Sequence, residues 1–214
     1  IVTEWDPQYD NRRIQSFTSL GEAGDAPIAW VDMPEINRVP PEPPEFHNEE
    51  WFNRMGRVSD WNTFEQVVQG DFPGGLKDLR TENPNVRAAV TRVFQDWITK
   101  TNIDGFRVDT VKHVEEDFWS EWAPAIRSHA ADLGKDKFLI YGEVFDGNDA
   151  LVGAYTQADM LDGNVDFAAK YQVFQGVFKN GSPTSTVSDL YDARQVNWGD
   201  EPQPGGVDVA PRDL

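Results

Sequence analysis

Two short segments place charged side chains where an apolar strand is about to end. In IDGFRVD, residues 103–109, Arg107 and Asp109 lie two positions apart, and in KFLIYGEVF, residues 137–145, Glu143 follows an apolar run. Alternate residues of a strand share a face, so we expect Arg107 and Asp109 to lie on one face. Two carboxylates in different environments, here Asp109 and Glu143, are what cleavage of a glycosidic bond requires.

These residues must be positioned by helices and strands, and from residue 84 onward the sequence predicts a strict alternation of the two. Asn83 followed by Pro84 is typical of a helix start. The expected helices cover residues 84–100, 115–133, 148–157, 167–178 and 185–195, and the expected strands cover 103–109, 137–145 and 158–163. This order predicts an α/β fold of βα units around a parallel sheet. Pro124 is expected to kink or divide its helix, and Phe174 and Phe178 to belong to the apolar side of theirs.

A structural explanation competes with a chemical one for these charges. In a parallel sheet covered by helices both faces are buried, and Arg107 and Asp109 could simply neutralise each other. A desolvated ion pair is often no more stabilising than apolar residues of equal volume, however. The carboxyl ends of parallel strands are also where such enzymes place their chemistry. We therefore favour function, and expect Gly142 to leave room for a ligand beside Glu143.

The composition narrows the classes of partner. The 214 residues are 39% hydrophobic and include eight Trp and thirteen Phe, which is enough for a sizeable core. A net charge of −18 disfavours nucleic acid and anionic membranes as partners. The absence of Cys excludes disulfides, thiolate metal sites and cysteine nucleophiles. No apolar run approaches the roughly 20 residues needed to span a bilayer.

The first 80 residues lack the regular helix and strand pattern of the rest. Five prolines between Pro34 and Pro44 favour extended backbone. We interpret residues 1–80 as an irregular inserted side domain and residues 81–214 as the βα part. The chain begins with IVTEWDPQYD, without an initiator Met or a signal-peptide pattern, and is expected to be an internal piece of a longer protein.

The same segments carry a family resemblance. DGFRVDTVKH, residues 104–113, resembles the second conserved motif of the α-amylase superfamily of glycoside hydrolases, and IYGEVF, residues 140–145, resembles the third. GLKDLRTENPNVRAAV, residues 75–90, is similar to the segment that joins the inserted side domain to the third barrel helix. The resemblance implies a partial (β/α)₈ TIM barrel of about three βα units, roughly strands 4 to 6, with the side domain in residues 1–80.

The resemblance also implies catalytic roles. Asp109 would be the nucleophile that forms a covalent glycosyl-enzyme, and Glu143 the general acid and then the base that activates water. Arg107 would hold Asp109 ionised and oriented.

Further residues receive roles from the resemblance alone. Lys112 and His113 would contact the sugar on the leaving-group side. A structural calcium would bind where the side domain meets the barrel, with Asp78 as a side-chain ligand and His113 as a carbonyl ligand, since Ca²⁺ prefers oxygen. Lys77 and Arg80 stand where the family often has proline and an acidic residue. No organic cofactor is implied.

Two family motifs are missing from the sequence. The aspartate strand ending in Asn-His is absent, and so is the Asn-His-Asp segment that supplies a third essential carboxylate. Asp166 is expected to start a helix rather than to replace that carboxylate. We therefore expect little or no turnover from the isolated chain, and open sheet edges would favour its self-association.

The leading hypothesis is a retaining hydrolase of α-1,4 bonds in an α-glucan or maltooligosaccharide, with secretion expected for an enzyme that degrades a polymer. Transglycosylases, α-1,6-acting enzymes and trehalose-forming isomerases of the same superfamily remain alternatives. So does a non-catalytic α-glucan-binding or interaction protein on the same scaffold. An unrelated α/β fold with a structural ion pair would instead hold Asp109 and Glu143 far apart.

Overall fold

The computed structural model describes residues 42–53, 55–72, 76, 78–157 and 159–214, together with the strand backbone of Ser19–Leu20 and Pro27–Ile28. The chain divides into two compact units, residues 1–90 and 91–214. Residues 1–18, 21–26 and 29–41, which make up much of the predicted side domain, lie outside the described part. The predicted domain boundary after residue 80 therefore stays a prediction.

The first unit contains short elements joined by irregular backbone. Strands β1 (Ser19–Leu20) and β2 (Pro27–Ile28) pair antiparallel. The 3₁₀ helices η4 (Pro44–His47) and η5 (Glu49–Trp51) and the helix α1 (Phe64–Gln69) follow. Buried Asn53 connects this backbone to Asp78: its N–H donates to the Asp78 carbonyl at 3.0 Å and its side-chain amide to Asp78 Oδ2 at 2.8 Å.

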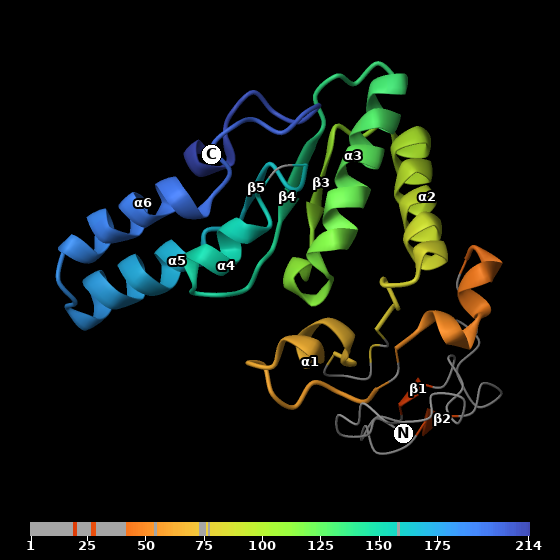
Figure 1. Ribbon diagram of the computed structural model, residues 1–214, viewed down its shortest axis with the longest axis horizontal. Helices are drawn as coiled ribbons and strands as arrows, with labels where there is room; N and C mark the ends of the chain where they lie inside the picture. Colours follow the sequence, from red (N-terminus) through yellow and green to blue (C-terminus); the bar gives the residue numbers. More distant parts are fainter. Residues whose placement is uncertain are drawn as a thin grey trace. The chain divides into compact units, whose positions relative to one another are not determined.

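A parallel sheet organises the second unit. Its strands are β3 (Gly105–Val108), β4 (Leu139–Gly142) and β5 (Gly163–Asn164), in the order β3-β4-β5 (Figure 1). The predicted parallel arrangement is confirmed. The third strand was expected at 158–163 but begins at Gly163. The backbone before it folds back against the C-terminal end of helix α4 (Asp149–Ala154). There the N–H of Leu161 donates to the carbonyl of Tyr155 at 3.0 Å.

Helices α2 (Pro84–Thr101) and α3 (Glu116–Asp132) lie next to each other on the same side of β3 in Figure 1. Phe94 of α2 contacts Phe106 of β3 and Trp122 of α3, with ring centroids 5.2 and 5.1 Å apart. The predicted helix start is confirmed, since Asn83 Oδ1 accepts the N–H of Asn85 at 2.9 Å. None of the helices in the described part of the chain is both long and apolar enough to cross a membrane.

Helix α3 continues through Pro124, so the expectation that proline divides this helix is wrong. The side chains of Trp122 and Ile126, on either side of it, are fully buried. Their packing holds both halves of the helix and outweighs the local cost of proline.

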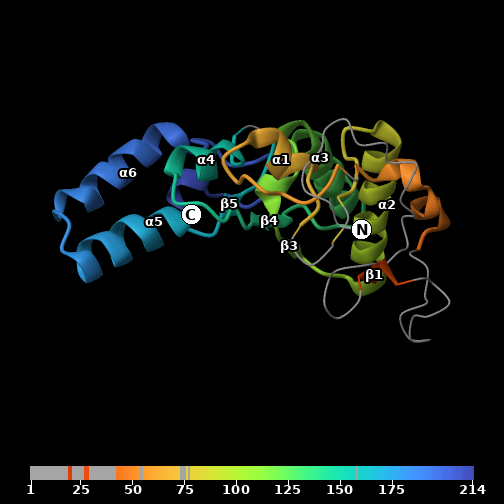
Figure 2. The same ribbon diagram turned by 90° about the horizontal axis from the view of Figure 1, so that it is seen from below.

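A helical layer follows the sheet along the chain. It consists of α4, of α5 (Phe167–Ala169) continued by the π-helix η7 (Lys170–Lys179), and of α6 (Ser185–Asn197), which lies beside α5 and η7 in Figures 1 and 2. Phe174 and Phe178 are 64% and 74% exposed, so their predicted place on the buried side is wrong. A π-helix has more residues per turn than an α-helix, and the 3.6-residue pattern therefore leaves the core.

Candidate active site

The candidate site lies at the carboxyl ends of β3 and β4. Arg107 stands opposite Tyr141 in the strand register, and Asp109 and Glu143 each follow two residues later. The strand pairing continues past the strand ends: the N–H of Glu143 donates to the Val108 carbonyl at 2.8 Å, and the N–H of Val111 to the Glu143 carbonyl at 3.0 Å. The backbone thus fixes Glu143 beside the segment that carries Asp109.

Arg107 connects the two carboxylates. Its Nη1 lies 3.5 Å from Asp109 Oδ2, and its Nη2 forms an ion pair with Glu143 Oε2. The structure therefore brings together the three residues that the sequence singled out. Because one guanidinium reaches both carboxylates, Asp109 and Glu143 lie on either side of a single side chain, at the strand ends where parallel-sheet enzymes place their chemistry.

The expected burial of this ion pair is wrong. The side chains of Arg107, Asp109 and Glu143 are 52%, 66% and 24% exposed. The aromatic side chains of α2 and α3 pack against Phe106, which points to the opposite face of β3 from Arg107. An exposed ion pair contributes about 0–1 kcal/mol to stability. Fold stability therefore gives little reason for these charges.

Gly142 does not leave room for a ligand, so that expectation is also wrong. A Cβ at this position would lie 2.2 Å from Asn164 Oδ1, 2.6 Å from Leu161 Cδ1 and 3.0 Å from Val111 Cγ2. The space beside the Gly142 backbone is already filled by these neighbours. Glycine is needed here for close packing of β4 against β5 and the loop after β3.

Lys112 and His113 belong to the 3₁₀ helix η6 (Val111–His113), which begins after Thr110 in the left-handed region at φ 54°. The Lys112 ammonium donates to the Phe145 carbonyl at 2.6 Å and pairs with Asp146 at 3.2 Å. It thus joins the loop after β3 to the loop that follows Glu143. The sugar contacts assigned to Lys112 and His113 stay predictions.

Asp78 and His113, the predicted calcium ligands, lie in the two different compact units. The Asp78 carboxylate accepts the amide of Asn53, a donor that occupies an oxygen a cation would need. Across residues 42–53, 55–72, 76, 78–157 and 159–214, no group of three or more His, Asp or Glu side chains could hold a metal ion. The described side chains around Asp78 do not make up a Ca²⁺ site by themselves, and calcium binding stays a prediction.

A second cluster of one arginine and two carboxylates was not foreseen. Arg194 of α6 donates to Asp149 Oδ1 at 3.0 Å and to both oxygens of Asp166 at 2.8 Å. Asp149 also accepts the indole N–H of Trp198 at 3.1 Å and the side-chain amide of Asn197 at 2.9 Å. These bonds join the starts of α4 and α5 to the end of α6.

Asp166 starts α5, as predicted: its Oδ1 accepts the N–H of Ala169 at 2.8 Å. Burial alone would raise the pKa of Asp166, but the hydrogen bonds and charge of Arg194, with the Ala169 N–H, hold it below the ordinary value. Burial alone would likewise lower the pKa of Arg194, yet the two carboxylates raise it above its ordinary value. Asp166 and Arg194 are therefore both charged around neutral pH.

The family model for the catalytic domain of α-amylase matches residues 37–196 of the 214. The chain belongs to the α-amylase family. It is 40% identical to an α-amylase of Streptomyces lividans over 116 residues, which are 52% of this chain and 12% of that protein. It is 32% identical to a β/α-amylase of Paenibacillus polymyxa over 154 residues, which are 68% of this chain and 11% of that protein.

Among solved structures, the α-amylase of Geobacillus thermoleovorans in complex with acarbose is similar with a TM-score of 0.61 and 30% identity, over 72% of this chain and 34% of that chain. The chain thus spans between 11% and 34% of the lengths of these three α-amylase relatives. The likeness confirms the predicted fold, a partial (β/α)₈ barrel. Membership of the α-amylase family also rules out the unrelated α/β fold.

Proposed function

We propose that this chain is the central part of a retaining α-glucan-active glycoside hydrolase that cleaves α-1,4-glucosidic bonds. The observation that carries the proposal is the contact of one guanidinium, that of Arg107, with both Asp109 and Glu143 at the ends of neighbouring parallel strands. The α-amylase relatives and the acarbose held by one of them support an α-glucan as the substrate.

The reaction would use the two carboxylates in turn. Asp109 attacks the anomeric carbon while Glu143 gives its proton to the leaving oxygen, so that the glycosidic C–O bond breaks and an Asp109–sugar ester forms. Glu143, now a base, takes a proton from water as the water oxygen attacks the same carbon and releases Asp109. Two displacements at one carbon retain the configuration.

The ion pair between Arg107 and Glu143 has to open before the first step. A general acid carries its proton, and a protonated carboxyl no longer offers a full negative charge to the guanidinium. A sugar entering between the two carboxyls would separate Arg107 from Glu143 and leave Arg107 to orient Asp109. Lys112 and His113 would contact the sugar on the leaving-group side, and Asp78 with the His113 carbonyl would take part in binding calcium.

The test is to trap the sugar on the enzyme. The full-length polypeptide carrying Glu143→Gln is incubated with α-maltotriosyl fluoride, because fluoride leaves without a general acid. The first displacement then proceeds, and the second stalls for want of a base. We expect a mass increase of one maltotriosyl group, located on Asp109 by peptide mapping, and no increase when Asp109→Asn is added.

A sugar bound to a different carboxylate, or hydrolysis of the fluoride with inversion and no adduct, would overturn the assignment. The 214-residue chain, tested in parallel on maltotriose, is expected to give little or no turnover, because it lacks the segment that supplies the third carboxylate in the family. Robust hydrolysis by the 214-residue chain would show that this expectation is wrong.

A further inference from the structure

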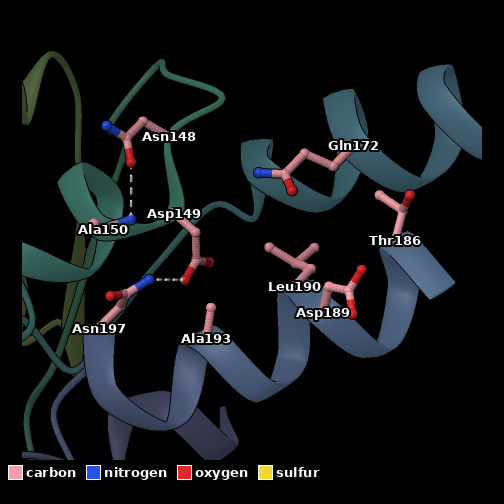
Figure 3. Close-up of a pocket in the computed structure, with 9 residues that line it drawn as sticks. All are labelled: Asn148, Asp149, Ala150, Gln172, Thr186, Asp189, Leu190, Ala193 and Asn197. Atoms are coloured by element: carbon pink, nitrogen blue, oxygen red, sulfur yellow. Dashed lines mark hydrogen bonds between the residues drawn. The ribbon is translucent and has the colours of Figure 1, made fainter.

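A cavity of about 390 Å³ lies between the start of α4, the π-helix η7 and one side of α6 (Figure 3). This is near the lower end of the roughly 300–1,000 Å³ found for small-molecule sites. Its lining does not include Arg107, Asp109 or Glu143, so it is separate from the candidate active site.

Hydrogen bonds fix the walls of this cavity. Asn197 donates to Asp149 Oδ2 at 2.9 Å (Figure 3). Asp149 is itself held by Arg194. The Gln172 amide donates to the Gly147 carbonyl at 3.0 Å, which ties η7 to the loop before α4. Asn148 Oδ1 accepts the N–H of Ala150 at 3.1 Å. The positions of these side chains are therefore set before any ligand arrives.

The same bonds leave other atoms of these side chains unused. Among the residues the structure describes, none forms a hydrogen bond with the amide nitrogen of Asn148 or with the amide oxygens of Gln172 and Asn197. The same holds for the Thr186 hydroxyl and the Asp189 carboxylate. The cavity thus offers several acceptors and two groups able to donate. In Figure 3, Leu190 and Ala193 point from α6 into the space between these polar groups and give it an apolar floor.

Polar groups around an apolar floor favour one class of ligand. An anion is disfavoured by Asp189, and the described residues hold no group of three or more side chains suited to a metal ion. A sugar ring has hydroxyls that donate and accept on its edge and C–H groups on its faces, so it matches both the polar rim and the apolar floor.

We propose that this cavity binds a single glucosyl unit of an α-glucan and anchors the polymer at a distance from the bond that is cleaved. The proposal rests on the proposed function for the identity of the sugar. The cluster of buried Arg194, buried Asp149 and half-buried Asp166 then has a second consequence, because it holds the α4 wall of the cavity against α6.

The experiment follows the backbone amides of the ¹⁵N-labelled 214-residue chain by NMR during titration with maltotriose. We expect saturable shifts at Thr186, Asp189 and Ala193. Ala193→Phe, which fills the cavity from its floor, should weaken this binding at least tenfold. Gln195→Phe is the matched control: both positions are exposed on α6, but Gln195 does not line the cavity, and its variant should titrate like the unmodified chain. Amide dispersion verifies that both variants fold.

The absence of saturable shifts on α6, or an Ala193→Phe variant that binds as the unmodified chain does, would overturn the cavity proposal. Neither result affects the proposed function, which is read from the sugar attached to Asp109 in the full-length polypeptide. Conversely, binding on α6 without an adduct on Asp109 would keep the cavity and reject the retaining mechanism.

Discussion

Two clusters in the described part of the chain each join one arginine to two carboxylates, and they differ in their access to water. Arg107 contacts Asp109 and Glu143 with 52% of its side chain exposed. In the second, the buried cluster, the side chains of Arg194 and Asp149 are 8% and 5% exposed, although that of Asp166 is 32% exposed. The first cluster stands at strand ends, whereas the second ties helix ends together. We infer that the same three charges serve chemistry where a substrate can enter between them and serve the fold where other side chains close them off.

The largest effect separates activity from stability at the exposed cluster. In the full-length enzyme, Glu143→Gln should lower kcat by about 10²–10⁴-fold through loss of acid–base catalysis. In the 214-residue chain, where its partner Arg107 is 52% exposed, the same change should lower the free energy of unfolding by no more than about 1 kcal/mol. Steady-state hydrolysis of maltooligosaccharides and urea unfolding measure the two quantities. Glu116→Gln, an exposed change on α3, is the control and should alter neither. A Glu143→Gln variant that unfolds readily would remove the distinction between the clusters.

The second prediction concerns two variants, in each of which one of the two arginines is replaced by methionine. Arg194→Met leaves Asp149 buried without its counter-charge and should cost about 3–5 kcal/mol of unfolding free energy. Arg107→Met leaves two carboxylates that water still reaches, and should cost no more than about 1 kcal/mol. Urea unfolding of the two variants beside the unmodified chain gives both numbers. Equal costs would show that burial does not distinguish the two clusters.

The third prediction concerns how Arg107 acts. Arg107→Lys keeps the positive charge but replaces a planar fork by a single ammonium, which cannot contact Asp109 and Glu143 in the same way. Misplacing a reacting group by an ångström can cost on the order of 10²-fold in rate, and we expect a loss of this size in kcat with little change in KM. A change confined to KM would instead mean that Arg107 only binds the sugar.

The exposed cluster was predictable from the sequence because its signals are local. Arg107 and Asp109 share a face by strand alternation, and Glu143 ends the next strand in the same way. The environment of these residues was not predictable. The burial of each face of the sheet depends on which helices cover it, and the space beside Gly142 depends on Asn164 and Leu161, which come later in the chain.

The buried cluster could not be predicted, because its members are far apart in the sequence. Arg194 lies 45 residues after Asp149 and 28 residues after Asp166. Only the role of Asp166 as a helix start, a local feature, was predicted. The π-helix η7 was missed for a related reason: its sequence has the spacing of an α-helix, and the tertiary environment changes the number of residues per turn.

The smallest expected effect tests the charge on Asp166. Its pKa is held below the ordinary value of 3.8, chiefly by Arg194 acting against the effect of burial. A carboxyl with a depressed pKa contributes stability that is fully present above the unfolded pKa and is lost as the pH falls through the folded pKa. The contribution of Asp166 should therefore disappear below pH 3.8.

Acidification from pH 6 to pH 3 also takes the net charge from strongly negative through zero near pH 4.4 to positive values. Repulsion within the chain therefore first falls and then grows, and this obscures the effect of a single group. The comparison is therefore made between the unmodified chain and Asp166→Asn, by urea unfolding from pH 6 down to pH 3. The unmodified chain should be the more stable at pH 6, and the difference should shrink as Asp166 takes up its proton. A difference independent of pH would mean that the charge of Asp166 is not what stabilises the fold, and that the buried cluster needs only one of its two negative charges.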